Sequence, residues 1–441
     1  MKFPKHPPSR TELLQQISPE RLMQILSTVT EPTVSGKYVH WDDLRHREPP
    51  SGLTLPEWWL GLTFHRAPGK IIALTDSEGQ RFSFRVIEPI QEQLHRIDLL
   101  AGGGIQMQEQ VTNPETKRRY LVRTLMDEAI TSSQLEGAVT TREVAKEMIR
   151  TGRQPRDRSE RMILNNYETM QRIGEIREQP LSRDLVFELH RRITDETLDD
   201  PTAAGRFRRD DEHRVVGDHL GEVFHNPPPA GQLDARMTAM CDFANALSHE
   251  GFIHPVIRSI ILHFWLAYDH PFVDGNGRTA RALFYWSMLH HGYWLFEYVS
   301  ISQVILRGPV RYGEAFLHTE TDSNDLTYFL IYNLYVIGRS IDALYHYIEN
   351  RGNELGELEH KLRGIAELNH RQRELIRHAL RHPGFSYTVA SHRASHGVVL
   401  MTARTDLQDL ESRGLLSKKK SGKAWVFTPV HDLENKLRER R

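Results

Sequence analysis

The stretch His270-Pro271-Phe272-Val273-Asp274-Gly275-Asn276-Gly277-Arg278-Thr279-Ala280-Arg281 brings several chemically useful side chains close together in sequence. The imidazole of His270 can act as a general base, and the carboxylate of Asp274 can bind a divalent cation. The Gly275-Asn276-Gly277 turn has little side-chain bulk, so its backbone N–H groups can approach a ligand closely. This composition indicates a reactive site, and the helices on either side of it are expected to hold that site in place.

A helix is expected to begin at this turn and to run through Leu289 to Gly292. The free N–H groups of its first turn would form an anion site. Arg278 and Arg281 are three residues apart, so they project from one face of that helix near its start. Together these groups predict a site for a polyphosphate and for the nucleophile that attacks it. The alternative is a Gly-Asn-Gly turn between two buried helices, with arginines on the surface.

The chain around this stretch has a helical pattern. From Pro114 onward, helical spacing of apolar residues continues for about two hundred residues. Pro255 is placed to open the helix that ends near His270, and apolar residues cover most of its circumference. Apolar residues also dominate the helix after the turn. Two buried helices on either side of a polar loop would hold that loop still.

The stretch 270–281 resembles the signature of the Fic family, H-x-F-x-[D/E]-G-N-G-R-x-x-R, at every fixed position. The resemblance implies an all-helical enzyme that moves AMP from ATP, with Mg²⁺, to a Ser, Thr or Tyr hydroxyl of a target protein. His270 would be the catalytic base and Asp274 the metal ligand. The phosphates would be bound by Gly275, Asn276, Gly277, Arg278 and Arg281.

The segment Ser132-Ser133-Gln134-Leu135-Glu136-Gly137 is similar to the inhibitory motif of this family, [S/T]-x-x-x-E-[G/N]. It lies at the end of a helix predicted over 115–136. The resemblance implies that Glu136, with Ser132, belongs to an inhibitory site and that Glu136 pairs with Arg281. That pair would block the productive position of the terminal phosphate, because an Arg–carboxylate pair is geometrically specific. The alternative is an ordinary helix C-terminus.

A β-hairpin is predicted over about 215–223, where the family has a flap that aligns the target by edge-strand pairing. Val216 is assigned to this flap. Tyr312 matches the family's nucleobase-contacting tyrosine. Near Thr319 the sequence departs from the family pattern and about three extra residues follow, which leaves the base specificity open. The alternative for 215–223 is a surface hairpin.

Three domains are predicted: an N-terminal α+β extension at 1–112 with a β-hairpin, a Fic domain at 113–357, and a domain at 358–441 that resembles a winged helix-turn-helix of bacterial regulators. Residues 361–441 contain 17 Lys+Arg and 8 Asp+Glu, a net charge of +9. DNA binding through 385–428 is one interpretation of this basic domain. Protein docking or dimerisation is the other.

Composition sets the remaining limits. The 441 residues include one cysteine, which excludes a disulfide framework and fits a reducing cytoplasm. No apolar run near 18 residues is present, so export and membrane insertion are not expected.

Self-modification and a homodimer are further expectations. The alternatives are removal of AMP, transfer of another nucleotidyl or phosphoryl group by the same site, and a DNA-binding regulator with a nucleotide-sensing Fic body.

Overall fold

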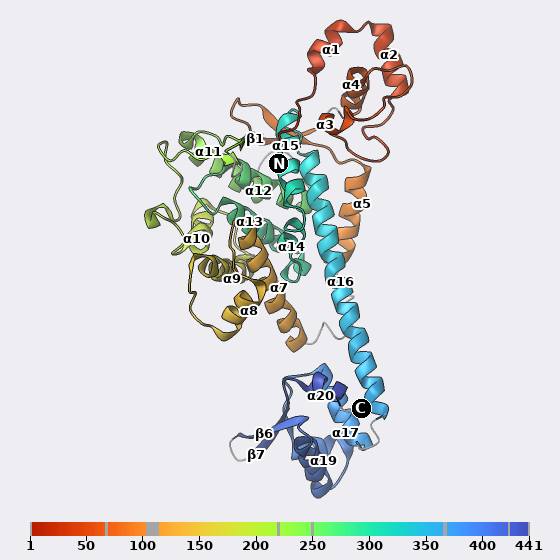
Figure 1. Cartoon of the computed structure of the whole chain (residues 1–441), viewed down its shortest axis with the longest axis vertical. Helices are drawn as coiled ribbons and strands as arrows, with labels where there is room; N and C mark the ends of the chain where they lie inside the picture. Colours follow the sequence, from red (N-terminus) through yellow and green to blue (C-terminus); the bar gives the residue numbers. More distant parts are fainter. Residues whose placement is uncertain are drawn as a thin grey trace. The chain divides into compact units, whose positions relative to one another are not determined.

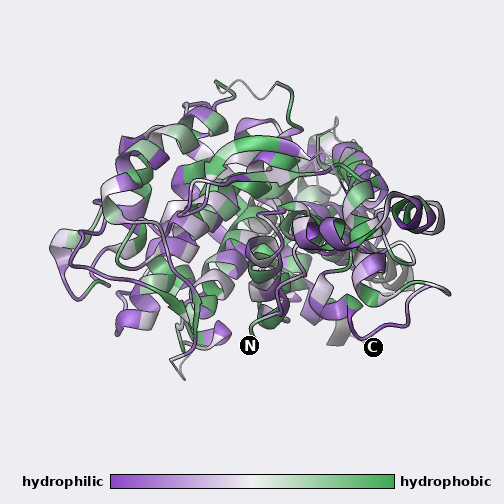
Figure 2. Cartoon of the chain, turned by 90° about the horizontal axis from the view of Figure 1, so that it is seen from above, coloured by the Kyte–Doolittle hydropathy of each residue, from purple (hydrophilic) through white to green (hydrophobic). Residues whose placement is uncertain are grey.

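The fold is mainly helical (Figure 1). The computed structural model describes residues 2–66, 69–102, 114–217, 221–247, 251–364, 368–421 and 424–439. Most helices carry both hydrophobic and hydrophilic residues along their length, as expected for helices with one buried side (Figure 2). No helix in these ranges is long and apolar enough to cross a membrane.

The helices and strands follow one another in this order. The α-helices are α1 (Arg10–Gln16), α2 (Pro19–Thr28), α3 (Trp41–Leu44), α4 (Leu55–His65), α5 (Glu88–Ile97), α7 (Pro114–Leu135), α8 (Arg142–Thr151), α9 (Arg158–Ile176), α10 (Arg183–Thr194), α11 (Leu233–Ala244), α12 (Pro255–Asp269), α13 (Asn276–His290), α14 (Ile301–Ile305), α15 (Pro309–Thr321), α16 (Thr327–Gly364), α17 (His370–Arg381), α18 (Val389–His396), α19 (Leu400–Ser412) and α20 (Leu433–Glu439). The strands are β1 (Lys70–Thr75), β2 (Arg81–Phe84), β3 (Val216–Gly217), β4 (Val223–His225), β5 (Tyr387–Thr388), β6 (Leu416–Ser421) and β7 (Ala424–Pro429).

The chain separates into two compact units. The first comprises Met1–Gly103 and Thr124–Ile341, and the second comprises Gly104–Arg123 and Asp342–Arg441. Helices α7 and α16 therefore contribute residues to both units. The domain boundaries predicted from the sequence at 112/113 and 357/358 stay predictions, and the first of them lies outside the described residues.

Helices α12 and α13 form the centre of the first unit and pack along each other. Pro255 occupies the first turn of α12, and the side chain of His254 caps it by accepting a hydrogen bond from the Val256 N–H. Both helices are buried nearly all round, as the apolar pattern predicted. The largest buried side chains include Trp265 and Trp286, one from each helix. This packing fixes the end of α12 and the start of α13, which the loop 270–275 connects.

The N-terminal extension has the predicted α+β character. Strands β1 and β2 pair antiparallel, and helices α2 and α4 share a separate apolar cluster that contains Ile25, Trp58 and Trp59. The buried guanidinium of Arg66 donates to the hydroxyl of Tyr328 over 2.9 Å. Because a buried arginine needs several acceptors, this contact fastens the extension to the core that carries the reactive loop.

The second unit contains helices α17 to α20 and a three-stranded sheet, and the winged helix-turn-helix assignment of 358–441 stays a prediction. Its sheet has the strand order β5-β7-β6, with all pairs antiparallel. In α19, Ala403, Leu407 and Leu410 are buried and form the inward face of this helix. Asp406 is buried as well, because its carboxylate accepts hydrogen bonds from Arg371 of α17 and His392 of α18.

Candidate active site

The loop between α12 and α13 begins with an unusual backbone turn. His270 ends α12 in the left-handed conformation, with φ at 44°. Arg208 holds this turn in two ways: its Nε donates to the His270 carbonyl over 2.9 Å, and its backbone N–H donates to the Pro271 carbonyl over 2.8 Å. The segment that precedes the flap therefore positions the imidazole, although Arg208 itself carries no reactive group.

The middle of the loop is fastened by Asn276 and His190. The Asn276 amide accepts from the Phe272 N–H over 2.9 Å and donates to the Phe272 carbonyl over 2.8 Å. Phe272 is fully buried, and its ring stacks on His190 with centroids 3.7 Å apart. His190 Nε2 lies 2.9 Å from the Asp274 carbonyl, while its Nδ1 accepts from the Gly205 N–H. The side chain of Asn276 is thus committed to the loop, which leaves only its backbone for a ligand.

The side chain of His270 is half-buried, and its burial affects the protonation state of the imidazole. Burial lowers its pKa to about 4, although the neighbouring Glu136 acts in the opposite direction. Its Nδ1 lies 3.4 Å from the Ala267 carbonyl, a long contact that orients the ring only weakly. The imidazole is therefore unprotonated at neutral pH, which is the form that a general base requires.

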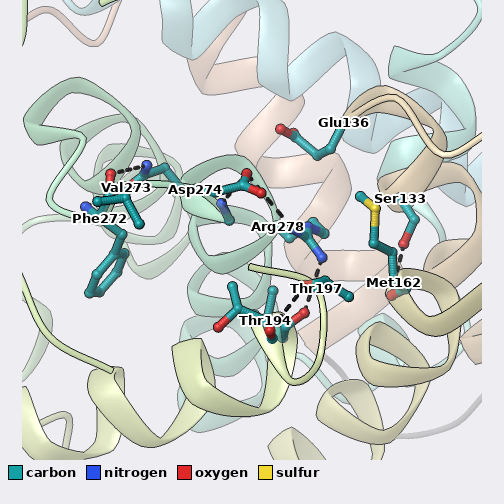
Figure 3. Close-up of polar contacts among 12 residues, drawn as sticks. Ser133, Glu136, Met162, Thr194, Thr197, Phe272, Val273, Asp274 and Arg278 are labelled. Carbon is teal, nitrogen blue, oxygen red and sulfur yellow. Dashed lines mark hydrogen bonds and ion pairs between the residues drawn. The ribbon is translucent and has the colours of Figure 1, made fainter. Parts of the chain in front are cut away.

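Asp274 presents a partly open carboxylate at the start of α13. Its side chain is 43 % exposed, and Oδ1 accepts the Gly275 N–H over 2.6 Å. The guanidinium of Arg278 lies 3.9 Å from Oδ1, and that of Arg158 lies 3.6 Å from Oδ2. Figure 3 shows Asp274, Arg278 and Glu136 around the start of this helix. An accessible carboxylate beside cationic groups can bind a hydrated cation that also contacts phosphate.

The two glycines of the turn have different physical roles. Gly275 has φ of 81°, and a Cβ on it would lie 2.7 Å from the methyl carbon of Thr194. A Cβ on Gly277 would instead lie 2.1 Å from Oε1 of Glu136. The Glu136 carboxylate therefore lies directly against the first turn of α13, where the helix favours an anion.

Arg278 is buried but incompletely paired. Its Nη1 donates to the Ile193 carbonyl over 3.0 Å, whereas its Nε and Nη2 are buried without a hydrogen-bond partner. Burial lowers its pKa, although Asp274 and Glu136 favour the charged form. A buried cation with unused donors is costly unless an anion completes it. The phosphate chain of a nucleotide is suited to that role.

In Arg281, both Nε and Nη2 have hydrogen-bond acceptors. Its Nε and Nη2 donate to the hydroxyl and the carbonyl of Ser132 over 2.8 and 2.9 Å. Nη2 also donates to Oε1 of Glu136 over 2.8 Å. Burial lowers the pKa of Arg281, but Glu136, Tyr312 and Glu128 together act against it and the net pKa is raised. Glu136 therefore contacts this guanidinium through Nη2, and Ser132 accepts from both Nε and Nη2.

Val216 and Tyr312 lie at the edges of this arrangement. Val216 is exposed on β3 and pairs with His225 of β4, so the described part of the predicted flap is a hairpin. Residues 218–220 of that flap lie outside the described residues. The Tyr312 hydroxyl lies 2.7 Å from Nε2 of the buried His263. The sequence did not single out His190 or His263, because neither differs in its sequence context from the other histidines, which number 24 in all.

Comparison with known proteins agrees with this geometry. Residues 180–288 match the Fic/DOC family. These residues form a Fic/DOC family domain. Over 108 residues the chain is 36% identical to the protein adenylyltransferase Fic of Drosophila willistoni and 37% identical to that of Drosophila melanogaster. Each match covers 24% of this chain and 20% of the relative, so the chain spans about a fifth of the length of the curated relatives it matches.

A solved structure extends the likeness of the fold beyond the Fic domain. A Fic family protein from Desulfovibrio desulfuricans G20 superposes with a TM-score of 0.53 at 18% identity. The superposition covers 79% of this chain and 97% of that protein. The predicted family resemblance and the mainly helical Fic fold are thereby confirmed.

The ionisation of His270 can be measured in the free protein. With its pKa lowered to about 4, the His270 imidazole should remain neutral at pH 6, where an ordinary histidine is largely protonated. Titration by NMR of histidine-labelled protein, with the signal assigned by comparison with His270→Asn, tests this. A midpoint near 6.5 would contradict the burial of the base.

Proposed function

We propose that this chain is a protein adenylyltransferase, which transfers AMP from ATP to a Ser, Thr or Tyr hydroxyl of a target protein. One observation supports this above all: a neutral, half-buried His270 sits on the same loop as the anion-binding start of α13, beside the incompletely paired Arg278. A base next to a cationic phosphate site is the arrangement that nucleotidyl transfer to a hydroxyl requires.

In the proposed reaction His270 takes the proton of the target hydroxyl. The hydroxyl oxygen then attacks the α-phosphorus of ATP, and the bond from that phosphorus to the oxygen that bridges to the β-phosphate breaks. AMP becomes esterified to the target and pyrophosphate leaves. The backbone N–H groups of Gly275, Asn276 and Gly277 hold phosphate oxygens, and Arg278 stabilises the negative charge on the leaving pyrophosphate.

Mg²⁺ fits the proposal through Asp274. This carboxylate is partly exposed and lies at the edge of the phosphate site, and Mg²⁺ is commonly held by one or two carboxylates together with substrate phosphates. When bound, the cation neutralises phosphate charge. No group of three or more His, Cys, Asp or Glu side chains that could hold a metal occurs among the residues that the structure describes, so the substrate itself would complete the coordination.

The inhibitory role of Glu136 is part of the same proposal. The carboxylate occupies the side of α13 above Gly277 and uses a donor of Arg281 that the terminal phosphate of ATP would need. A second anion cannot share that place without strong repulsion. Productive binding of ATP therefore requires Glu136 to leave.

Residues at the edges of the site would recognise the target protein and the nucleobase of ATP. We assign alignment of the target to the flap around Val216, through edge-strand pairing, and contact with the adenine to the side of the site where Tyr312 lies. The same residues are compatible with removal of AMP from a modified target or with transfer of another nucleotidyl or phosphoryl group. Product analysis by mass spectrometry with a panel of nucleotides and a modified target separates these reactions.

Removal of the Glu136 carboxylate should activate the protein. Glu136→Gly is expected to increase ATP consumption and self-modification about tenfold to a hundredfold, since a hydrogen bond between charged groups contributes about 1.5–3 kcal/mol. The measurement is incorporation of labelled AMP. Glu178→Gly, which removes another carboxylate just past a helix end, serves as the matched control and should behave as the wild type. Equal labelling of both variants would refute the inhibitory assignment.

Loss of the base should separate catalysis from binding. In the Glu136→Gly background, His270→Ala should lower AMP transfer by about 10²–10⁴-fold, while the dissociation constant of ATP changes little. Labelling assays and calorimetry measure the two quantities. Transfer that survives the substitution would favour the view that the Fic body only senses nucleotide.

We also propose that the second unit binds duplex DNA. Helix α19 exposes Arg404, Thr405 and Gln408, and it packs against β6, where Lys419 and Lys420 are exposed. A polar helix face beside a basic strand is suited to a groove and the adjacent phosphates. The cytoplasm would provide both this partner and the protein targets.

DNA binding should depend on these side chains and on salt. Full-length protein is expected to bind duplex DNA with an affinity that falls steeply as salt rises, and Arg404→Ala combined with Lys419→Ala should weaken binding about tenfold or more. Fluorescence anisotropy of labelled duplex DNA measures the affinity, and Arg183→Ala in the first unit is the control. Undiminished binding by the double variant, or none by the wild type, would favour protein docking or dimerisation instead.

A further inference from the structure

Helices α7 and α13 face each other through two matching rows of side chains. Glu128, Ser132 and Glu136 follow at intervals of four residues on α7 and just beyond its end. Tyr285, Arg281 and Gly277 follow at the same interval in the reverse direction on α13. Residues four apart share one face of a helix, so the rows meet as an antiparallel ladder with three rungs.

The first rung joins Glu128 to Tyr285. The Glu128 side chain is buried, and its Oε2 accepts the Tyr285 hydroxyl over 2.8 Å and the Ser300 hydroxyl over 2.8 Å. Ser302 adds its backbone N–H and its hydroxyl, at 3.1 and 2.5 Å. A buried carboxylate with this many donors is well satisfied where it is and would be costly to move.

The second and third rungs lead to the candidate active site. Ser132 accepts from Arg281, and the Glu136 carboxylate contacts Arg281 and lies against Gly277. The side chain of Glu136 is 28 % exposed, whereas Glu128 is 1 % exposed. The ladder is therefore firm at the Glu128 end and accessible to solvent at the Glu136 end.

Helix α7 also makes polar contacts with α9: the Ser133 hydroxyl donates to the Met162 carbonyl, and the Asn166 amide donates to the Ala129 carbonyl. Asp127 pairs with Arg142 and Lys146 of α8, which ties α7 to the helix that follows it in the chain. Ile130 packs in an apolar cluster with residues of α8 and α9. Apolar surfaces tolerate small sliding, but a displacement of one turn, about 5.4 Å, would leave Glu128 without its donors.

We propose that Glu128 and Tyr285 are a positioning pair that sets the register of α7, and thereby how firmly Glu136 covers the phosphate site. This inference rests on the proposed function, because it concerns the strength of the inhibition. It adds a second carboxylate, remote from the nucleotide, to the inhibitory device. Neither residue touches the substrate.

The test is Tyr285→Phe, which removes one hydroxyl from the first rung and keeps the ring. The variant should show about fivefold to tenfold more self-modification with labelled ATP than the wild type, since the anchor of Glu136 is weakened. Ser302→Ala, which removes a different donor from the same carboxylate, should act in the same direction. This second variant is informative even where Tyr285→Phe fails to fold.

Two controls distinguish an effect on the register of α7 from a general loss of protein stability. Tyr293→Phe removes a buried hydroxyl bonded to Asp98 over 2.6 Å, outside the ladder, and should leave self-modification unchanged. In a Glu136→Gly background, Tyr285→Phe should give no further increase, because there is no inhibitory carboxylate left to position. A residue with only a structural role would lower activity in both backgrounds.

The outcomes separate this inference from the proposed function. Activation by Glu136→Gly but by neither Tyr285→Phe nor Ser302→Ala would overturn the positioning pair and leave the proposed function standing. Equal activation by Tyr285→Phe with and without Glu136 would overturn it too. An inactive Glu136→Gly variant would instead count against the proposed function.

Discussion

The candidate site depends on how one side chain holds the loop between two buried helices. Asn276 bonds both the N–H and the carbonyl of Phe272, which closes the loop like a short turn. Without this contact two backbone groups would be buried unpaired, and the left-handed turn at His270 would lose its support. Arg208 and His190 then fix the two sides of the loop from other segments. The geometry of base and anion site follows from these constraints.

Charge is distributed unevenly around that loop. Arg278 and Arg281 are both buried, but Arg278 has two buried nitrogens without a hydrogen-bond partner, whereas Arg281 donates three hydrogen bonds to Ser132 and Glu136. Ser132 lies on α7, and Glu136 directly follows it. In this site, the guanidinium of Arg281 is paired with a carboxylate, whereas the guanidinium of Arg278 still has donors without an acceptor. An anion such as a nucleotide phosphate would complete the second and compete for the first.

In the proposed function, helix α7 would control access to the site through contacts far from the loop. Its buried carboxylate Glu128 lies two helical turns before Glu136 and accepts from hydroxyl and amide donors of α13 and of the segment after it. In our proposal, a change at Glu128 alters the position of Glu136, which directly follows the same helix. The proposed coupling needs no change in the loop 270–275 itself.

The sequence by itself determined the mainly helical fold, the family resemblance and the burial of the two helices on either side of the loop. These features are local: they follow from helical periodicity and from fixed spacing within a short stretch. The tertiary structure alone showed that Asn276 fastens the loop, that Arg278 keeps unused donors and that Glu128 meets Tyr285. Each of these depends on which distant segments meet, and the burial and pairing of a polar group are decided only when they do.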